Sequence, residues 1–133
     1  MEHPNEMQAF TRNGIKAAIN LCHGASKAAG WWIDPKTGAD DLLDPKTIPM
    51  KIALIHSELS EALEGHRKGK MDEHLPNRTS LEVELGDALI RIYDLAGAYN
   101  LDLSGAVLDK LAYNAQRADH KMENRQASGG KAD

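Results

Sequence analysis

The feature that most constrains this chain is a row of charged residues with apolar residues on both sides of it, in one predicted helix. That helix is expected from about residue 80 to 100, where apolar side chains recur at steps of three and four residues. Its broad apolar face comprises Leu81, Leu85, Ala88, Leu89, Ile92, Leu95, Ala96 and Tyr99, and a second strip comprises Val83 and Ile90. Between the two strips lie Glu84, Asp87, Arg91 and Asp94. This pattern predicts that Glu84 and Asp87 are partly buried, and buried carboxylates need partners.

The helix predicted before it, from about residue 51 to 68, carries a matching pair of acids. Glu58 and Glu61 are three residues apart and therefore share one helix face, about a turn apart. The same spacing separates Glu84 from Asp87. The polar loop of residues 69–79 allows the two helices to run antiparallel. Folded in that way, the two pairs can face each other as four carboxylates around one small volume.

Four carboxylates at such close quarters repel one another. Two like charges ~4 Å apart cost roughly 4 kcal/mol at an effective dielectric constant near 20. The acids must therefore spread into water, take up protons or hold a divalent cation. Since only oxygen ligands are offered, the pattern favours Mg²⁺, with Mn²⁺ as a possible substitute, over zinc. Arg91 is a further candidate partner for one of the buried acids. The competing interpretation is that all four are surface acids near helical Lys and Arg residues.

The remaining segments complete an all-α antiparallel bundle of four main helices. Besides the two central helices, we expect helices over about residues 6–29 and 104–122. Residues 1–122 form a single domain in this interpretation, and residues 123–133 form a disordered tail. Residues 33–49 form a long loop, which is a candidate lid over the carboxylates. Trp31 and Trp32, at the end of the first helix, either plug the core or stack on a nucleobase.

Several polar side chains are candidates for binding an anionic ligand. Lys110, Asn114 and Arg117 share a narrow sector of the last predicted helix. A solvated basic face is the simpler interpretation of this stripe. Opposite a cation held by acids, however, the same stripe would bind the oxygens of a polyphosphate. Lys51 lies a heptad before Glu58 and shares its face.

Composition limits the compartment and the class of partner. A formal net charge of −4 and an isoelectric point near 5.8 give no general attraction to nucleic acid polymers or anionic membranes. The lone Cys22 excludes an intrachain disulfide and is typical of a reducing compartment. No apolar run is long enough to span a bilayer, and the first residues lack a signal-peptide pattern. We therefore expect a soluble, cytoplasmic protein.

The sequence lacks the motifs of several other nucleotide-binding and metal-binding sites. It contains no Walker-type glycine loop, no GxGxxG and no HExxH, and one cysteine cannot form a thiolate cluster. A di-iron bundle also places carboxylates on facing helices, but it normally needs Glu-x-x-His on two of them. Neither Glu58 nor Glu84 is followed by a histidine at that spacing.

Residues 55–64 (IHSELSEALE) and 84–91 (ELGDALIR) together resemble the MazG-like nucleoside triphosphate pyrophosphohydrolases. That all-α superfamily has the motif EExxE, then a spacer, then ExxD. Lys110, Tyr113, Asn114 and Arg117 are similar to its K-x-x-Y-N-x-x-R element. Ser57 departs from the pattern, because many members have the first Glu at this position. No role of that Glu is carried over.

The resemblance implies hydrolysis of a (deoxy)nucleoside triphosphate to the monophosphate and pyrophosphate, as a clean-up of the nucleotide pool. It implies Mg²⁺ held by Glu58, Glu61, Glu84 and Asp87, and we expect Glu58 also to accept the proton of the attacking water. The residues expected to bind the phosphates, sugar or base are Lys51, Lys110, Asn114, Arg117, Trp31 and Trp32. The resemblance further implies a homodimer or homotetramer with helical cores shared between chains, and the second apolar strip independently suggests additional burial.

Two alternatives stay open. A non-catalytic helical interaction module would explain the helices and the second apolar strip, and it would bind no metal. A phosphoribosyl-ATP pyrophosphohydrolase, from the same superfamily, would share the chemistry but not the substrate. The sequence names neither the base nor the sugar.

Overall fold

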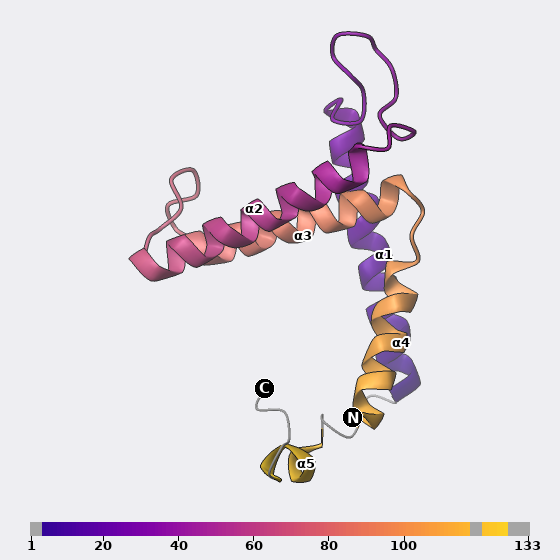
Figure 1. The fold of residues 1–133 in the computed structure, drawn as a ribbon, viewed down its shortest axis with the longest axis vertical. Coiled ribbons are helices and arrows are strands. Elements are labelled where there is room, and N and C mark those ends of the chain that lie inside the picture. The colour runs from indigo at the N-terminus through magenta and orange to yellow at the C-terminus, as the bar shows by residue number, and fades with distance from the viewer. Residues whose placement is uncertain (1–3, 118–120, 128–133) are drawn as a thin grey trace. The chain divides into compact units, whose positions relative to one another are not determined.

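The computed structural model describes residues 4–117 and 121–127, and these residues form helices joined by loops (Figure 1). The helices are α1 (Pro4–Ala28), α2 (Thr47–Lys68), α3 (Ser80–Ala98), α4 (Leu103–Gln116) and α5 (Met122–Gln126). Within the described ranges, β structure is limited to two isolated bridges, Ile33 with Asp40 and Met71 with Thr79. The all-α prediction is therefore confirmed. No helix in these ranges is long and apolar enough to cross a membrane.

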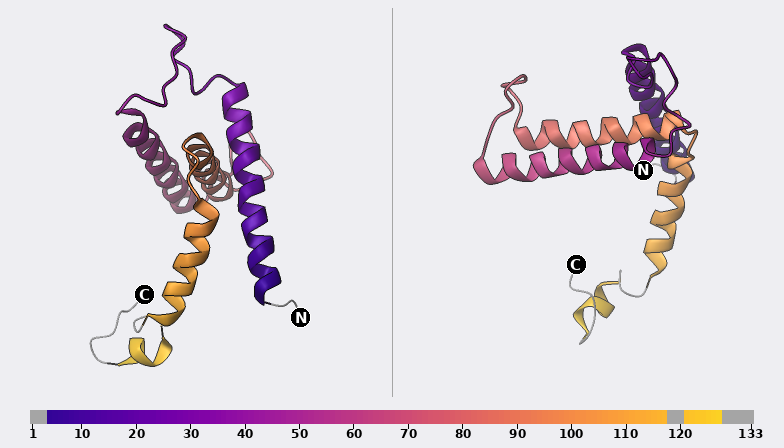
Figure 2. Two further views of the ribbon diagram at one scale, coloured as in Figure 1. Left: turned by 90° about the vertical axis from the view of Figure 1, so that its right-hand side faces the viewer. Right: turned by 45° about the horizontal axis from the view of Figure 1, so that its top comes forward.

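The chain divides into two compact units, residues 17–101 and residues 1–16 with 102–133, so that α1 contributes to both. The larger unit is organised by α2 and α3, which lie side by side in opposite directions, as the right-hand view of Figure 2 also shows. Small and aliphatic side chains fill their contact, and Ile55, Ala62, Ala88 and Ala96 are buried. Alanine at three of these positions lets the two helices approach closely.

Local chemistry defines both ends of the loop between α2 and α3. At Gly69 the backbone has a φ of 60°, and its N–H bonds back to the carbonyls of Gly65 and His66, which ends α2. At Thr79 the side chain accepts a hydrogen bond from the Glu82 N–H, and the Glu82 carboxylate accepts one from the Thr79 N–H. This capping box starts α3.

Gly65 is required by the close approach of α2 to the start of α3. A Cβ on residue 65 would lie 2.6 Å from the Cβ of Ser80, and closer still to its Oγ. Glycine therefore fixes where the two helices meet, about two turns after the first acid pair begins.

Trp31 and Trp32, after the end of α1, occupy very different environments. Gly30, with a φ of 82°, turns the chain just before them. Trp32 is 5% exposed, whereas Trp31 is 69% exposed. The Trp32 ring meets the Tyr99 ring edge-on, with centroids 5.9 Å apart, and its indole N–H donates to Asp94 on α3 at 2.8 Å. Trp32 thus plugs the core of the larger unit, while Trp31 stays at its surface.

One face of the α2–α3 pair is apolar and exposed. Leu85 and Leu89 on α3 belong to the predicted core face, and Leu59 and Leu63 lie on α2, yet between 44% and 60% of each of these four side chains is exposed. By helical periodicity these leucines fall on the side of the pair away from the acids. The predicted burial of Leu85 and Leu89 is wrong for the isolated chain. Two packed helices bury only the sides that face each other, and these leucines lie on another side.

The smaller unit contains the first part of α1 together with α4 and α5. α4 begins at Asp102, whose carboxylate accepts hydrogen bonds from the Gly105 N–H at 3.0 Å and the Ser104 hydroxyl at 3.2 Å. These two bonds hold the pKa of Asp102 below its ordinary value.

The last predicted helix, over residues 104–122, is wrong in its extent. α4 ends at Gln116, and Arg117 has an extended backbone whose N–H bonds to the Asn114 carbonyl. No glycine or proline marks this end, so the sequence pattern did not reveal it. Residues 122–126 form α5, and residues 128–133 lie outside the described residues, so the disordered tail over residues 123–133 stays a prediction. The single domain over residues 1–122 and the four-helix bundle stay predictions.

Candidate metal centre and the adjoining cavity

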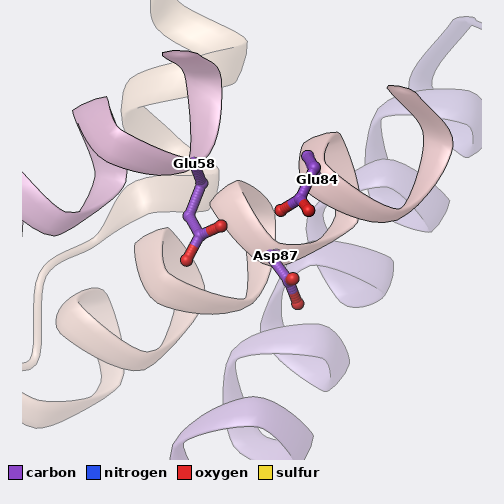
Figure 3. A group of neighbouring side chains, drawn as sticks. All are labelled: Glu58, Glu84 and Asp87. Atoms are coloured by element: carbon purple, nitrogen blue, oxygen red, sulfur yellow. The ribbon is translucent and has the colours of Figure 1, made fainter. Parts of the chain in front are cut away.

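Three carboxylates from α2 and α3 meet in one place. Glu58, Glu84 and Asp87 each offer an oxygen, and these oxygens all lie within 4.8 Å of one another. Figure 3 shows Glu58 on α2 facing the other two acids on α3. Oxygens that bind one Mg²⁺ at ~2.1 Å are at most ~4.2 Å apart. A small movement of these side chains would therefore bring all three onto one ion.

Glu84 is the least satisfied member of this trio. Its Oε2 is buried and has no hydrogen-bond partner among the described residues. Burial raises the pKa of Glu84 from its ordinary 4.5 to about 7, and the carboxylates of Glu58 and Glu61 add to the rise. A carboxylate in these surroundings is unfavourable when ionised, and a bound cation would remove the cause. The buried oxygen thus fits a metal ligand.

Glu61, the fourth predicted ligand, lies beside the trio rather than in it. Its side chain is exposed. It is nevertheless close enough to raise the pKa of Glu84, and it borders the same cavity. The structure therefore brings together three of the four predicted ligands and leaves the fourth next to them.

Arg91 pairs with Glu58 across the two helices, whereas the sequence pattern suggested it as a partner for Glu84 or Asp87. Its Nε donates to Glu58 Oε1 at 2.9 Å, and only 8% of Glu58 is exposed. This bond leaves the other carboxylate oxygen, Oε2, for a cation. Burial and the nearby Glu58 raise the pKa of Asp87, whereas Arg91 opposes that rise. The guanidinium therefore acts on two of the three acids.

The acids open into a cavity of about 660 Å³. One of its walls is residues 70–75 of the loop between α2 and α3. The predicted lid, residues 33–49, is shortened by α2 and is tied to the far end of α3, where the Tyr99 hydroxyl donates to the Leu42 carbonyl at 3.0 Å. Twelve residues separate Asp87 from Tyr99, about 18 Å along a helix. The loop that borders the acids is thus the shorter one.

A second cavity, of about 750 Å³, adjoins the trio on the side of α1. Its volume lies within the usual range for small-molecule sites. Apolar and small residues make up most of its wall: Leu21, Cys22, Ala25, Ala29, Trp31, Leu54 and Ile90. Asp87 borders both cavities, and the Arg91 side chain lines this one. The two cavities therefore meet at Asp87.

Of the two predicted stacking residues, Trp31 lines this apolar cavity and Trp32 is buried behind it. Lys51 also lies on the wall of this cavity. Its Nζ is 4.4 Å from the centroid of the Trp32 ring and 3.5 Å from the Trp31 carbonyl. The lysine thus braces both tryptophans.

Asp94 has a structural role that was not predicted from the sequence. Its carboxylate accepts hydrogen bonds from Ser26 Oγ at 2.8 Å and Trp32 Nε1 at 2.8 Å, and lies 2.9 Å from His23 Nδ1. Gly97 permits this approach, because a Cβ there would lie 2.5 Å from the Cβ of His23. Asp94 therefore anchors α1 and the tryptophan segment to α3. Its position in the charged row, between two apolar strips, was the sequence feature that could have predicted its burial.

Lys110, Asn114 and Arg117 belong to the smaller unit. The Lys110 Nζ lies 4.6 Å from the centroid of the Tyr113 ring, and Arg117 Nη1 donates to Asn114 Oδ1 at 3.4 Å. These contacts keep the three polar residues close together, although Arg117 follows α4 rather than belonging to it. Their part in binding stays a prediction.

A scan against models of known protein families found no match for this chain, and searches of curated proteins and of solved structures found none either. The residues of the site and their geometry are therefore the basis for its function.

Proposed function

We propose that the protein is a Mg²⁺-dependent nucleoside triphosphate pyrophosphohydrolase, which cleaves a (deoxy)nucleoside triphosphate to the monophosphate and pyrophosphate. The observation that carries the proposal is the trio of Glu58, Glu84 and Asp87, with its buried and unpartnered Glu84 oxygen, beside an apolar cavity. An all-oxygen ligand set suits Mg²⁺, with Mn²⁺ as a substitute. The same acids carry the resemblance to MazG-like enzymes.

In this proposal the nucleoside enters the apolar cavity and the phosphates point toward the acids. The exposed Trp31 ring offers a stacking surface for the base. Asp87 borders both cavities, so a ligand can extend from one to the other. Lys51, on the wall of the apolar cavity, supplies a cation for the sugar or phosphate end.

The trio, joined by Glu61 after a side-chain movement, would hold the metal ion. A bound Mg²⁺ supplies charge neutralisation at the phosphate oxygens and lowers the pKa of water. Glu58 is the proposed proton acceptor for the attacking water. Its hydrogen bond from Arg91 fixes the orientation of the carboxylate, since one oxygen is engaged and the other stays open.

Lys110, Asn114 and Arg117 complete the proposal as phosphate-binding residues. Their support is the K-x-x-Y-N-x-x-R pattern and the chemistry of two cations and an amide.

We also propose that the protein works as a homodimer or homotetramer. The support is the exposed apolar face that contains Leu59, Leu63, Leu85 and Leu89. A second copy of the same face would bury it and complete a four-helix core, because a two-fold interface joins identical patches. The acids fall on the other side of the helix pair and would remain open to substrate.

Purified protein tests this function with a panel of ribo- and deoxynucleoside triphosphates. We expect Mg²⁺-dependent release of pyrophosphate and the matching monophosphate, and loss of both in EDTA. Release of orthophosphate, or turnover that EDTA does not reduce, would contradict the proposal. Asp87→Asn is the matched variant, because it keeps the side-chain shape and removes a ligand charge.

The exposed leucine face favours one second candidate, a non-catalytic helical interaction module. Such a module gains nothing from Mg²⁺. A thermal melt with and without Mg²⁺ separates the two functions, because a metal that binds only the folded chain must raise the melting temperature.

A further inference from the structure

Arg91 occupies the boundary between the acids and the apolar cavity. Its Nε donates to Glu58 at 2.9 Å, while the same side chain lines the cavity that contains Trp31. The Arg91 side chain is 40% exposed, and Glu58 is its only hydrogen-bond partner among the described residues. The remaining N–H donors of its guanidinium are therefore available to a ligand.

In a nucleoside triphosphate the α-phosphate lies between the nucleoside and the outer two phosphates. This order determines which group of the ligand lies beside Arg91. If the nucleoside fills the apolar cavity and the metal-bound phosphates lie at the acids, the α-phosphate lies between them. We propose that Arg91 binds the α-phosphate of the substrate through its Nη groups while its Nε stays on Glu58. This inference rests on the proposed function and adds to it a residue that binds the phosphate at which the substrate is cleaved.

The planar guanidinium suits this double task. It can offer separate N–H donors to a carboxylate and to a phosphate, which a lysine ammonium does with less directional control. In the reaction a bond forms between the water oxygen and the α-phosphorus, and the bond to the bridging oxygen breaks. Pyrophosphate leaves with the electron pair, and the water proton goes to Glu58. Arg91 stays on the α-phosphate throughout and stabilises charge on its other oxygens.

Binding of the monophosphate product distinguishes Arg91 from residues that bind the β- and γ-phosphates. The monophosphate product keeps the α-phosphate, so it should keep the contact with Arg91. Product binding, which needs no turnover, therefore measures the contact directly. The probes are the four common deoxynucleoside monophosphates and their nucleosides, titrated by calorimetry in saturating Mg²⁺, with the tightest pair used for the variants.

For Arg91→Gln we expect monophosphate affinity to fall by about tenfold or more, and nucleoside affinity to change by less than about twofold. We also expect kcat to fall, because the contact strengthens as charge develops. An unchanged monophosphate affinity, or an equal loss for nucleoside and monophosphate, would overturn the proposal. Mg²⁺ affinity is titrated for each variant, since a role confined to orienting Glu58 would alter metal binding and spare the phosphate difference.

Arg67→Gln is the matched control, because it removes the same charge from a side chain that is 72% exposed on α2. It should leave both affinities unchanged, and a loss equal to that of Arg91→Gln would count against a specific contact. If Arg91→Gln does not fold, Arg91→Lys decides. It should weaken monophosphate binding more than nucleoside binding, and no such difference would refute the contact.

The wild-type protein keeps this test distinct from that of the proposed function. Monophosphate binding that depends on Arg91, without release of pyrophosphate from any triphosphate, would leave the phosphate contact standing and reject the hydrolase. If the wild type releases pyrophosphate and the Arg91→Gln variant binds the monophosphate normally, the hydrolase stands and the Arg91 contact is rejected.

Discussion

The indole N–H of Trp32 donates to Asp94 at 2.8 Å, and this bond connects the segment after α1 to the C-terminal part of α3. Only 13% of the Asp94 side chain is exposed, and Ser26 and His23 contact the same carboxylate. The wall of the apolar cavity that carries Trp31 is therefore held by buried polar contacts. Adjacent tryptophans thus occupy different environments, with Trp32 in the core and Trp31 on the wall of the apolar cavity.

Trp32→Phe should destabilise the fold, because it leaves part of Asp94 without a donor and removes part of a buried ring. We expect the free energy of unfolding to fall by about 1–3 kcal/mol, measured by urea denaturation. Trp31→Phe is the matched control and should change it by less than about 0.5 kcal/mol. Equal effects of the two changes would show that this division between the tryptophans is incorrect.

Asp87→Asn should weaken Mn²⁺ binding by at least about tenfold, as measured by electron paramagnetic resonance. Because burial and Glu58 raise the pKa of Asp87, the neutral amide should also leave the metal-free protein at least as stable as the wild type. Lost binding then cannot be attributed to unfolding. Glu64→Gln is the control, since Glu64 borders the same cavity but is paired with Lys68 at 2.6 Å. A loss of Mn²⁺ in Glu64→Gln alone would place the metal elsewhere.

Metal-free protein should lose stability as pH rises through the interval between about 4.5 and about 7. Burial raises the pKa of Glu84 from 4.5 to about 7, so in this interval the folded chain holds a proton that the unfolded chain releases. The contribution is fully present below the lower value and is lost above the upper one. Asp87, whose pKa is also raised, contributes with the same sign.

Urea denaturation in EDTA across this interval measures the slope, and Glu84→Gln should flatten it. The difference between the two proteins isolates the contribution of Glu84 from that of every other titrating group. Saturating Mg²⁺ should reduce the decline, because the metal favours the ionised carboxylate. A slope that survives in Glu84→Gln would assign the effect to other groups.

The sequence was most informative where local periodicity acts alone. The helix expected over residues 51–68 extends over 47–68, and the one expected over 80–100 extends over 80–98. Acid pairs at three-residue spacing on two adjacent helices converge because only one polar loop joins them. Glu58, Glu84 and Asp87 could therefore be placed together without coordinates.

What the sequence did not reveal depends on tertiary structure. The pattern could not tell Trp31 from Trp32, because their exposure is decided by the turn at Gly30 and by the acceptor on Asp94. It could not place the end of α4, where no helix-breaking residue occurs. It also counted leucines such as Leu89 as core, since an apolar stripe does not specify whether its own chain covers it.

Leu89→Lys should convert an assembled protein to a smaller species, because 48% of Leu89 is exposed on the apolar face that a second copy would cover. Light scattering after size exclusion measures the mass, and the wild type should show a melting temperature that rises with concentration. Leu43→Lys is the control, because Leu43 is 94% exposed in a loop and should leave the mass unchanged.

The Leu89→Lys chain should also still bind Mn²⁺, because Glu58, Glu84 and Asp87 come from one chain and lie on the other side of the helix pair. Metal binding and assembly are then separable, and turnover can be compared at equal metal occupancy. A wild-type protein that has the mass of one chain at every concentration would reject the shared core. Loss of Mn²⁺ on dissociation would instead show that a second chain contributes to the metal centre.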